Sequence, residues 1–352
     1  MKVDSNGVRL EVLVEGEGEP VLLLHGWPEA KELWANQVPA LAAAGYRVVA
    51  PDLRGFGESD RPEGVDAYSM VNCVVDVVAI LDAAEASAAH VVGHDFGSGL
   101  AWSVAAFVPD RVKRLVTMSV GHPVSLHHSD QEQYSRMWYT LLFQFEGIAE
   151  EWLSRDDWAN LRTFLADHPD LDRLIANLAR PGALTSTLNW YRANLPATRF
   201  TSPAIDFPPI KAPTLSIWSD HDHALLEPQM LASQQYVEGP WSYTRIEGVG
   251  HFIPLEAPDQ LNGVLLEFLA GERELHRCHA RSRCRPAPST RSPMSTSGSP
   301  PEARSVPRPR GAGFAPRDGT VDGDGRGRRV AAALATQGED DAAAVRGALG
   351  FT

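Results

Sequence analysis

The sequence has only three cysteines in 352 residues, Cys73, Cys278 and Cys284, which excludes a disulfide-rich scaffold and is typical of a reducing cytoplasm. No run approaches the roughly 18 consecutive apolar residues that a membrane helix requires. The first twenty residues lack the apolar stretch of a secretory signal. We therefore expect a cytoplasmic protein without a membrane partner.

Positive charge is scarce over most of the chain. Residues 1–271 carry a formal charge of −18, whereas residues 272–352 carry +5 and contain no lysine. Phosphate contacts need lysine and arginine, so the acidic part argues against nucleic acid as the main partner. Residues 272–352 lack Trp, Tyr and Ile and are rich in Arg, Pro, Gly and Ser, which predicts a disordered tail. Binding to an acidic partner, no role at all, and an out-of-frame read-through are the open interpretations of this tail.

Short apolar runs alternate with helix-like segments over residues 1–271, which is typical of an α/β fold with a mostly parallel central sheet flanked by helices. Residues 123–207 have helical patterns only and predict an inserted cap over the carboxyl ends of the strands, where ligands bind in such sheets. The expected parts are a core in two pieces (1–122 and 208–271), the cap (123–207) and the tail (272–352). The expected strands are Val8–Val14, Val21–Leu24, Arg47–Ala50, His90–Gly93, Arg114–Val120 and Thr214–Trp218, and the expected helices of the core include Tyr68–Ala84 and Gly97–Phe107.

The most specific local pattern is Gly93-His94-Asp95-Phe96-Gly97, which follows an expected strand and precedes an expected helix. It has the form of the nucleophile elbow of hydrolases, with aspartate where those enzymes carry serine. The glycines permit a sharp, strained turn that lifts the central side chain above the sheet. The pattern predicts Asp95 as a nucleophile, and an Asp95 that only caps the helix is the alternative.

A second turn, His25-Gly26-Trp27-Pro28, follows another apolar strand. Such a turn aims the Trp27 backbone N–H at the same pocket, where the Phe96 N–H completes a two-donor oxyanion hole. His25, Gly26 and Pro28 are expected to shape this turn. A tight turn without a catalytic role is the alternative.

The candidate acid and histidine follow the nucleophile in the order that α/β-hydrolases use. Asp222 lies in the loop after an expected strand, and His251 follows the next strand. Asp222 would orient the His251 imidazole and stabilise its protonated form. Asp220 is the competing acid, and His221 and His223 are expected to be exposed loop residues.

Together, HGWPE, DLRGFGES, GHDFG, the Asp222 loop and GVGHF resemble the epoxide hydrolases of the α/β-hydrolase fold, over roughly residues 20–270. The segments YTLLFQ, which begins at Tyr139, and NWYR, which contains Tyr191, resemble two cap motifs of that family. The resemblance implies that these two tyrosines hold the epoxide oxygen and donate its proton; on the residues alone they are buried cap aromatics. Two features depart from the family: Phe96, where many relatives carry Trp, and the tail.

The resemblance implies hydrolysis of an epoxide to a vicinal diol in two steps. Asp95 attacks an epoxide carbon and forms an ester, which water activated by His251 then hydrolyses. The oxyanion of the second step forms on Asp95 and is held by the N–H groups of Trp27 and Phe96. The expected substrate is a small, largely apolar epoxide, and we expect no metal and no cofactor. A homo-oligomer is compatible with the sequence, which does not decide the oligomeric state.

Two other functions stay open. A haloalkane or haloacetate dehalogenase uses the same Asp-His-Asp arrangement but binds halide through Trp or Arg after the nucleophile or Asn after His-Gly; Phe96 and Trp27 occupy these positions here. A non-catalytic ligand-binding protein on this scaffold would have no use for His251. The cap residues that suggest an apolar pocket, with their facing left open, are Met137, Trp138, Leu142 and Phe145.

Overall fold

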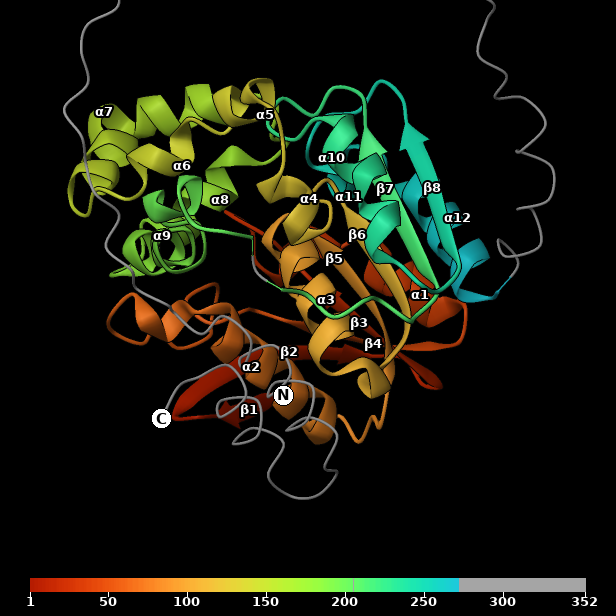
Figure 1. Ribbon diagram of the computed structural model, residues 1–352. Helices are drawn as coiled ribbons and strands as arrows, with labels where there is room; N and C mark the ends of the chain where they lie inside the picture. Colours follow the sequence, from red (N-terminus) through yellow and green to blue (C-terminus); the bar gives the residue numbers. More distant parts are fainter. Residues whose placement is uncertain (205, 272–352) are drawn as a thin grey trace, which may run out of the picture.

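A computed structural model describes residues 1–204 and 206–271 and centres on one eight-stranded sheet (Figure 1). The predicted tail lies outside the described residues. The strands are β1 (Lys2–Ser5), β2 (Val8–Glu15), β3 (Glu19–Leu24), β4 (Tyr46–Pro51), β5 (Ala89–His94), β6 (Val112–Met118), β7 (Thr214–Ser219) and β8 (Trp241–Ile246). Their order along the sheet is β1-β2-β4-β3-β5-β6-β7-β8. β2 pairs antiparallel with β1 and with β4, and all the other neighbours are parallel.

This arrangement confirms the predicted fold class. All six predicted strands exist, with shifted ends; β6 ends at Met118, two residues earlier than predicted, because Ser119 adopts a left-handed conformation (φ 65°) that leaves the strand. The short edge strand β1 was not predicted, since its four residues carry only Val3 as a large apolar side chain.

Helices cover both faces of the sheet and bury an apolar cluster on each (Figure 1). The helices α2 (Met70–Ala83) and α3 (Phe96–Phe107) lie on one face, and α1 (Gln37–Ala43) and α12 (Pro258–Leu269) lie on the other. α2 begins two residues later than predicted, because Tyr68 closes the 3-10 turn η2 (Asp66–Tyr68) and Ser69 leaves the helical conformation. The remaining core elements are η1 (Lys31–Trp34), η3 (Pro109–Arg111), α10 (Glu227–Ala232), η5 (Ser233–Tyr236) and α11 (Ile253–Glu256).

The segment between β6 and β7 is helical and gathers beyond one end of the sheet (Figure 1). The helical character predicted there is confirmed. Three separate helices begin within the stretch 130–153, the last of them directly after Gly147 (φ 77°), and the chain leaves helical geometry at 155–158. The division into a separate cap at 123–207 stays a prediction. The elements of this segment are α4 (Pro123–His127), α5 (Gln131–Arg136), α6 (Tyr139–Leu142), α7 (Ile148–Phe164), α8 (Leu171–Leu178), α9 (Ala183–Asn194) and η4 (Ala197–Phe200).

A buried ion pair attaches α9 to the core. The Arg54 guanidinium, in the loop after β4, donates to both carboxylate oxygens of Asp76 on α2, each at 2.6 Å. The Arg54 carbonyl in turn accepts a hydrogen bond from the Trp190 indole at 3.0 Å, next to Tyr191 on α9. A bidentate pair of this kind holds the loop in one geometry, and through it the helix that carries Tyr191.

We expect Asp76→Asn to destabilise the fold by about 3–5 kcal/mol, because it leaves the Arg54 charge buried without its partner. The measurement is the free energy of unfolding in urea at neutral pH. Asp172→Asn is the matched control: Asp172 pairs with Arg162 at 2.8 Å on the surface, with 86% of its side chain exposed, so its loss should cost less than about 1 kcal/mol. Equal losses in the two variants would contradict this expectation.

Candidate active site

Asp95 occupies a strained turn between β5 and α3. Its backbone has φ 54° and ψ −121°, a conformation that is rare for residues other than glycine and that marks functional sites. The turn needs glycine on both sides, because a Cβ at Gly93 would meet the backbone of Gly97, and a Cβ at Gly97 would meet the backbone of Leu24. The sequence therefore places Asp95 at the carboxyl end of the sheet with a nearly buried carboxyl group.

The turn after β3 contributes a backbone donor to this carboxylate. The Trp27 N–H donates to Asp95 Oδ1 at 2.8 Å. Gly26 is required there, since a Cβ would overlap the Asp95 carboxylate. The buried imidazole of His25 supports the turn: its Nε2 accepts from the Leu53 N–H at 3.0 Å, and its Nδ1 donates to the Gly26 carbonyl at 3.0 Å. The Phe96 N–H belongs to the first residue of α3, directly after Asp95.

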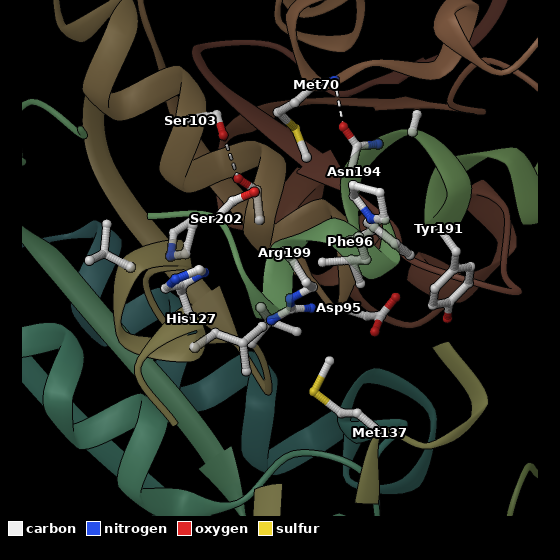
Figure 2. Close-up of a pocket in the computed structure, with 18 of the residues that line it drawn as sticks. Met70, Asp95, Phe96, Ser103, His127, Met137, Tyr191, Asn194, Arg199 and Ser202 are labelled. Carbon is white, nitrogen blue, oxygen red and sulfur yellow. Dashed lines mark hydrogen bonds between the residues drawn. The ribbon is translucent and has the colours of Figure 1, made fainter. Parts of the chain in front are cut away.

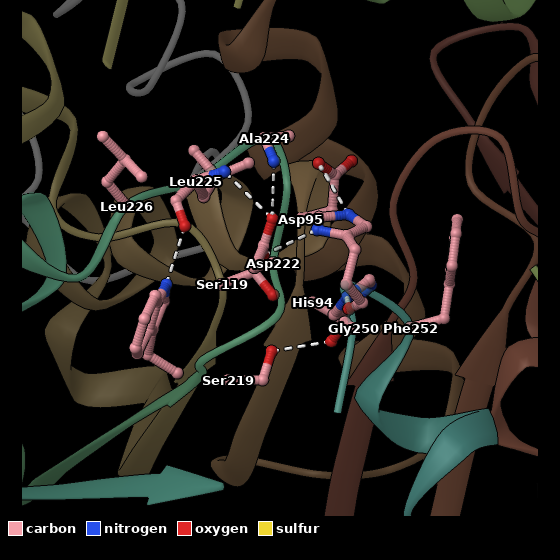
Figure 3. A network of polar contacts seen from close by, with 12 residues as sticks. His94, Asp95, Ser119, Ser219, Asp222, Ala224, Leu225, Leu226, Gly250 and Phe252 are labelled. Atoms are coloured by element: carbon pink, nitrogen blue, oxygen red, sulfur yellow. Dashed lines mark hydrogen bonds and ion pairs between the residues drawn. The ribbon is translucent and has the colours of Figure 1, made fainter. Parts of the chain in front are cut away.

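His251 lies between the carboxylates of Asp95, which follows β5, and Asp222, which lies in the loop after β7; β6 separates these two strands. Figure 3 shows both carboxylates. Its Nδ1 is 2.9 Å from Asp222 Oδ2, and its Nε2 is 3.6 Å from Asp95 Oδ2. The other Asp222 oxygen accepts from the Ala224 and Leu225 N–H groups at 3.0 and 2.9 Å. The structure thus brings Asp222 to His251.

Asp220, the competing candidate, does not reach His251. It accepts from the Gly248 N–H at 2.7 Å and pairs with Arg245 at 3.6 Å. His221 is exposed, as expected, but the expectation for His223 was wrong. His223 is half-buried and lines a small cavity together with His251, because its ring turns inward beside Phe164.

The two carboxylates control the charge of His251. Burial by itself lowers the pKa of the imidazole, but the charges and hydrogen bonds of Asp222 and Asp95 raise this pKa to about 10. Burial by itself raises the pKa of Asp222, and the imidazolium and two backbone N–H groups hold it below its ordinary value. In the free protein at neutral pH, His251 is therefore protonated and Asp222 is ionised.

Tyr139 and Tyr191 come from α6 and α9 and lie across the cavity from Asp95. Their ring centroids are 5.9 Å apart, and the ring of Tyr191 contacts that of Phe96 edge-on at 4.7 Å. Burial first, and the Asp95 charge with it, raises the pKa of both phenols, so both keep their protons. Gln144 ties the two helices together, since its amide donates to Thr140 on α6 and to the Tyr191 carbonyl on α9 at 2.9 and 3.4 Å.

A cavity of about 380 Å³ opens beside these residues (Figure 2). Asp95, Phe96 and both tyrosines are among its lining, and most of the rest is apolar. Of the four cap residues proposed for an apolar pocket, Met137 lines this cavity, whereas Trp138 and Phe145 are 48% and 58% exposed on the outer surface. Leu142 packs against the core. The cavity is therefore an apolar space with the candidate nucleophile at one side.

Sequence reasoning missed several supporting side chains. The buried Glu29, directly after Pro28, accepts from His168 Nε2 at 2.6 Å and from Arg173 Nη2 at 3.0 Å, and so joins the Trp27 turn to α8 and the loop before it. His94 donates to the His251 carbonyl at 2.8 Å, and burial lowers the pKa of His94 to about 4, so it stays neutral. Glu29 is visible in the sequence as the last residue of HGWPE. Its role could not be predicted, because its partners His168 and Arg173 lie more than 130 residues away along the chain.

Within residues 1–204 and 206–271, no group of three or more His, Cys, Asp or Glu side chains is arranged to hold a metal ion. In the same part of the chain no helix is long and apolar enough to cross a membrane. The cytoplasmic location stays a prediction.

The fold and the placement of Asp95, Asp222 and His251 after β5, β7 and β8 define an α/β hydrolase, and a family model described as the α/β hydrolase fold matches residues 19–258. Epoxide hydrolase A of Mycobacterium tuberculosis is 35% identical over 312 residues, covering 76% of this chain and 96% of the relative. Epoxide hydrolase 3 of Xenopus tropicalis is 32% identical, covering 79% of each chain. The crystal structure of epoxide hydrolase A from Mycobacterium thermoresistibile is 30% identical with a TM-score of 0.63, covering 77% of this chain and 98% of that one.

The chain therefore belongs to the epoxide hydrolases of the α/β-hydrolase fold, and it is a hydrolytic enzyme. This confirms the resemblance on which the sequence analysis relied.

The charge of His251 predicts a pH dependence of stability. The folded-state pKa of about 10 lies above the ordinary value of 6.5, so the stability that His251 contributes is complete below pH 6.5 and is lost as the pH rises through about 10. Between these two values, the free energy of unfolding of the wild type should fall more steeply than that of His251→Gln. Urea denaturation across this range measures both slopes, and parallel curves would show that His251 is not the titrating group.

Proposed function

We propose that this enzyme converts an epoxide and water to a vicinal diol through a covalent ester on Asp95. The observation that carries the proposal is the position of one carboxylate. Asp95 lies on a strained elbow, with a backbone donor on Oδ1, an imidazole beside Oδ2 and two protonated phenols across the cavity. An sp³ carbon with a strained oxygen leaving group suits a carboxylate nucleophile, whereas serine hydrolases attack an acyl carbon.

In the first step, Oδ2 of Asp95 attacks an epoxide carbon, since Oδ1 is held by the Trp27 N–H. The C–O bond of the ring breaks, and the departing oxygen takes a proton from Tyr139 or Tyr191. A raised pKa suits this role, because it keeps each phenol in the donor form, while a phenol remains more acidic than an aliphatic alcohol. The product of this step is an ester between Asp95 and one carbon of the future diol.

The second step uses the charge balance around His251. Ester formation removes the negative charge of Asp95, one of the two charges that raise the pKa of His251. The pKa of the imidazole then falls, its Nε2 proton passes through solvent to the tyrosinate left by ring opening, and the neutral ring takes a proton from the attacking water. Water attacks the ester carbonyl, the oxyanion is held by the Trp27 and Phe96 N–H groups, and Asp222 stabilises the imidazolium that forms. Collapse of the oxyanion breaks the ester C–O bond, and the leaving diol oxygen takes the proton of the newly added hydroxyl, so that the Asp95 carboxylate and the His251 imidazolium are both restored.

The first test is the reaction with styrene oxide and with 1-chlorohexane. We expect the diol from the epoxide and no halide release from the chloroalkane.

Asp95→Ala should lose activity to background. His251→Gln should still form the ester but not hydrolyse it, so that intact-protein mass spectrometry shows the added mass of one substrate. In a single turnover of the wild type in ¹⁸O-water, the first diol should carry unlabelled oxygen from Asp95; full solvent label in that diol would rule out the ester.

The proton-donor role is tested by Tyr139→Phe and Tyr191→Phe. Each should slow ester formation by about 10- to 100-fold, a typical range for losing part of general acid catalysis, and the double variant should lose more. The hydrolysis of ester already formed should change little, because the phenols act on the epoxide oxygen. Rapid-quench kinetics separate the two rates. If ester formation keeps its rate in the double variant, the two tyrosines are not the donors.

A further inference from the structure

The large cavity contains a basic side chain for which the proposed reaction has no use. Arg199 belongs to η4 and is half-buried. It is the only lysine or arginine in the cavity lining that the structure describes, and Asp95 is the only acid there. Figure 2 shows its guanidinium directed into the space between Asp95, Met137 and His127.

Arg199 differs from the arginines that are buried against a carboxylate. Arg54 pairs with Asp76 at 2.6 Å, Arg173 with Glu29 at 3.0 Å and Arg192 with Glu150 at 2.9 Å. For Arg199, the described part of the chain provides no carboxylate within ion-pair distance; the guanidinium instead lies over the rings of Tyr134 and Phe200, at 5.7 and 6.0 Å from their centroids.

An unpaired charge in such a place has a physical cost. Burial lowers the pKa of Arg199, and only two phenols act against this effect: Tyr134 through its charge and a side-chain hydrogen bond, and Tyr139 through its charge. Partly desolvated charges are normally paired or hydrogen-bonded. A guanidinium is weakly hydrated and offers a planar pair of donors, a geometry that matches the two oxygens of a carboxylate.

Other residues around Arg199 suit an anion. His127, Thr198 and Ser202 line the same cavity and supply an imidazole and two hydroxyl groups. Between this end and Asp95 the lining is apolar, with side chains such as Val124, Met137 and Leu225. The cavity thus offers one place for a negative group and another for an epoxide, separated by an apolar surface.

We propose that Arg199 is an anion-binding subsite, and that the substrates of this enzyme are epoxides that carry a carboxylate at the far end of an apolar chain. The inference rests on the proposed function for its epoxide and on the cavity alone for its anion. Holding the carboxylate at Arg199 and the epoxide oxygen at the tyrosines fixes both ends of the substrate. The subsite thereby also selects which epoxide carbon faces Asp95.

The test compares ω-epoxy carboxylates of short, medium and long chain (pentanoate, octanoate and undecanoate) with their primary amides, which have the same shape without the charge. We expect the wild type to prefer the carboxylate for at least one chain length. Arg199→Gln should lower kcat/KM for that carboxylate by about 10- to 100-fold, the usual effect of losing a hydrogen bond to a charged group. Its kcat/KM for the amide and for styrene oxide should fall much less, because neither substrate carries the charge that Arg199 binds.

Arg136→Gln is the matched control, because it removes the same charge from α5, where Arg136 faces solvent and pairs only weakly with Glu132 at 3.9 Å. It should keep the preference for the carboxylate. Arg199→Lys should keep part of it, since lysine retains the charge but not the planar pair of donors. Two results would overturn the proposal: a wild type that treats every acid and its amide alike, or an Arg199→Gln that slows all substrates equally.

A binding experiment separates this proposal from the proposed function. Octanoate and octanamide cannot react, so calorimetric titration of the full chain measures the subsite without turnover. Octanoate that binds the wild type more tightly than Arg199→Gln, in a protein that hydrolyses no epoxide, would leave the subsite standing and overturn the proposed function. Hydrolysis of styrene oxide without any such difference for octanoate would overturn the subsite alone.

Discussion

The strained backbone at Asp95 is the constraint on which the site depends. A residue with φ 54° at the end of β5 directs its side chain away from the sheet and brings α3 directly behind it. That turn is possible only where neighbouring backbones come very close, which is why glycine stands at 26, 93 and 97. The strain is held by the buried parallel strands on both sides of β5, so the stability of the sheet maintains the geometry of the site.

Around that carboxylate, charge determines what each residue can do. His251 is protonated while two carboxylates surround it, and in the proposed reaction it becomes a base only when one of them is converted to an ester. The phenols keep their protons for the opposite reason, because burial and the Asp95 charge disfavour phenolate. In the proposed reaction, each change of charge therefore prepares the next proton transfer.

Most of the core and the triad could be predicted from the sequence because their signals are local. A buried parallel strand is a short apolar run, and the elbow and the oxyanion turn follow directly after such runs. Asp222 was predicted with Asp220 as its competitor, because the two lie two residues apart in one loop and only the loop conformation decides which carboxylate faces His251. The break before α7 lies at Gly147 (φ 77°), whereas the break between α5 and α6 has no glycine or proline to mark it in the sequence. The partners of Glu29 and the surroundings of Arg199 come from segments far apart in the sequence, so the local sequence pattern does not reveal them.

The net charge of residues 1–271 and the charge inside the cavity act over different distances. Residues 1–271 carry −18, a field that would repel an anionic substrate in dilute salt. At physiological ionic strength this field is screened within about 8 Å of the surface, whereas Arg199 acts on a bound group at contact distance inside a partly desolvated cavity. The acidic surface therefore slows encounter without weakening the contact at Arg199. It follows that the rate of association of a carboxylate substrate should rise with added salt, while its preference over the amide should depend on Arg199.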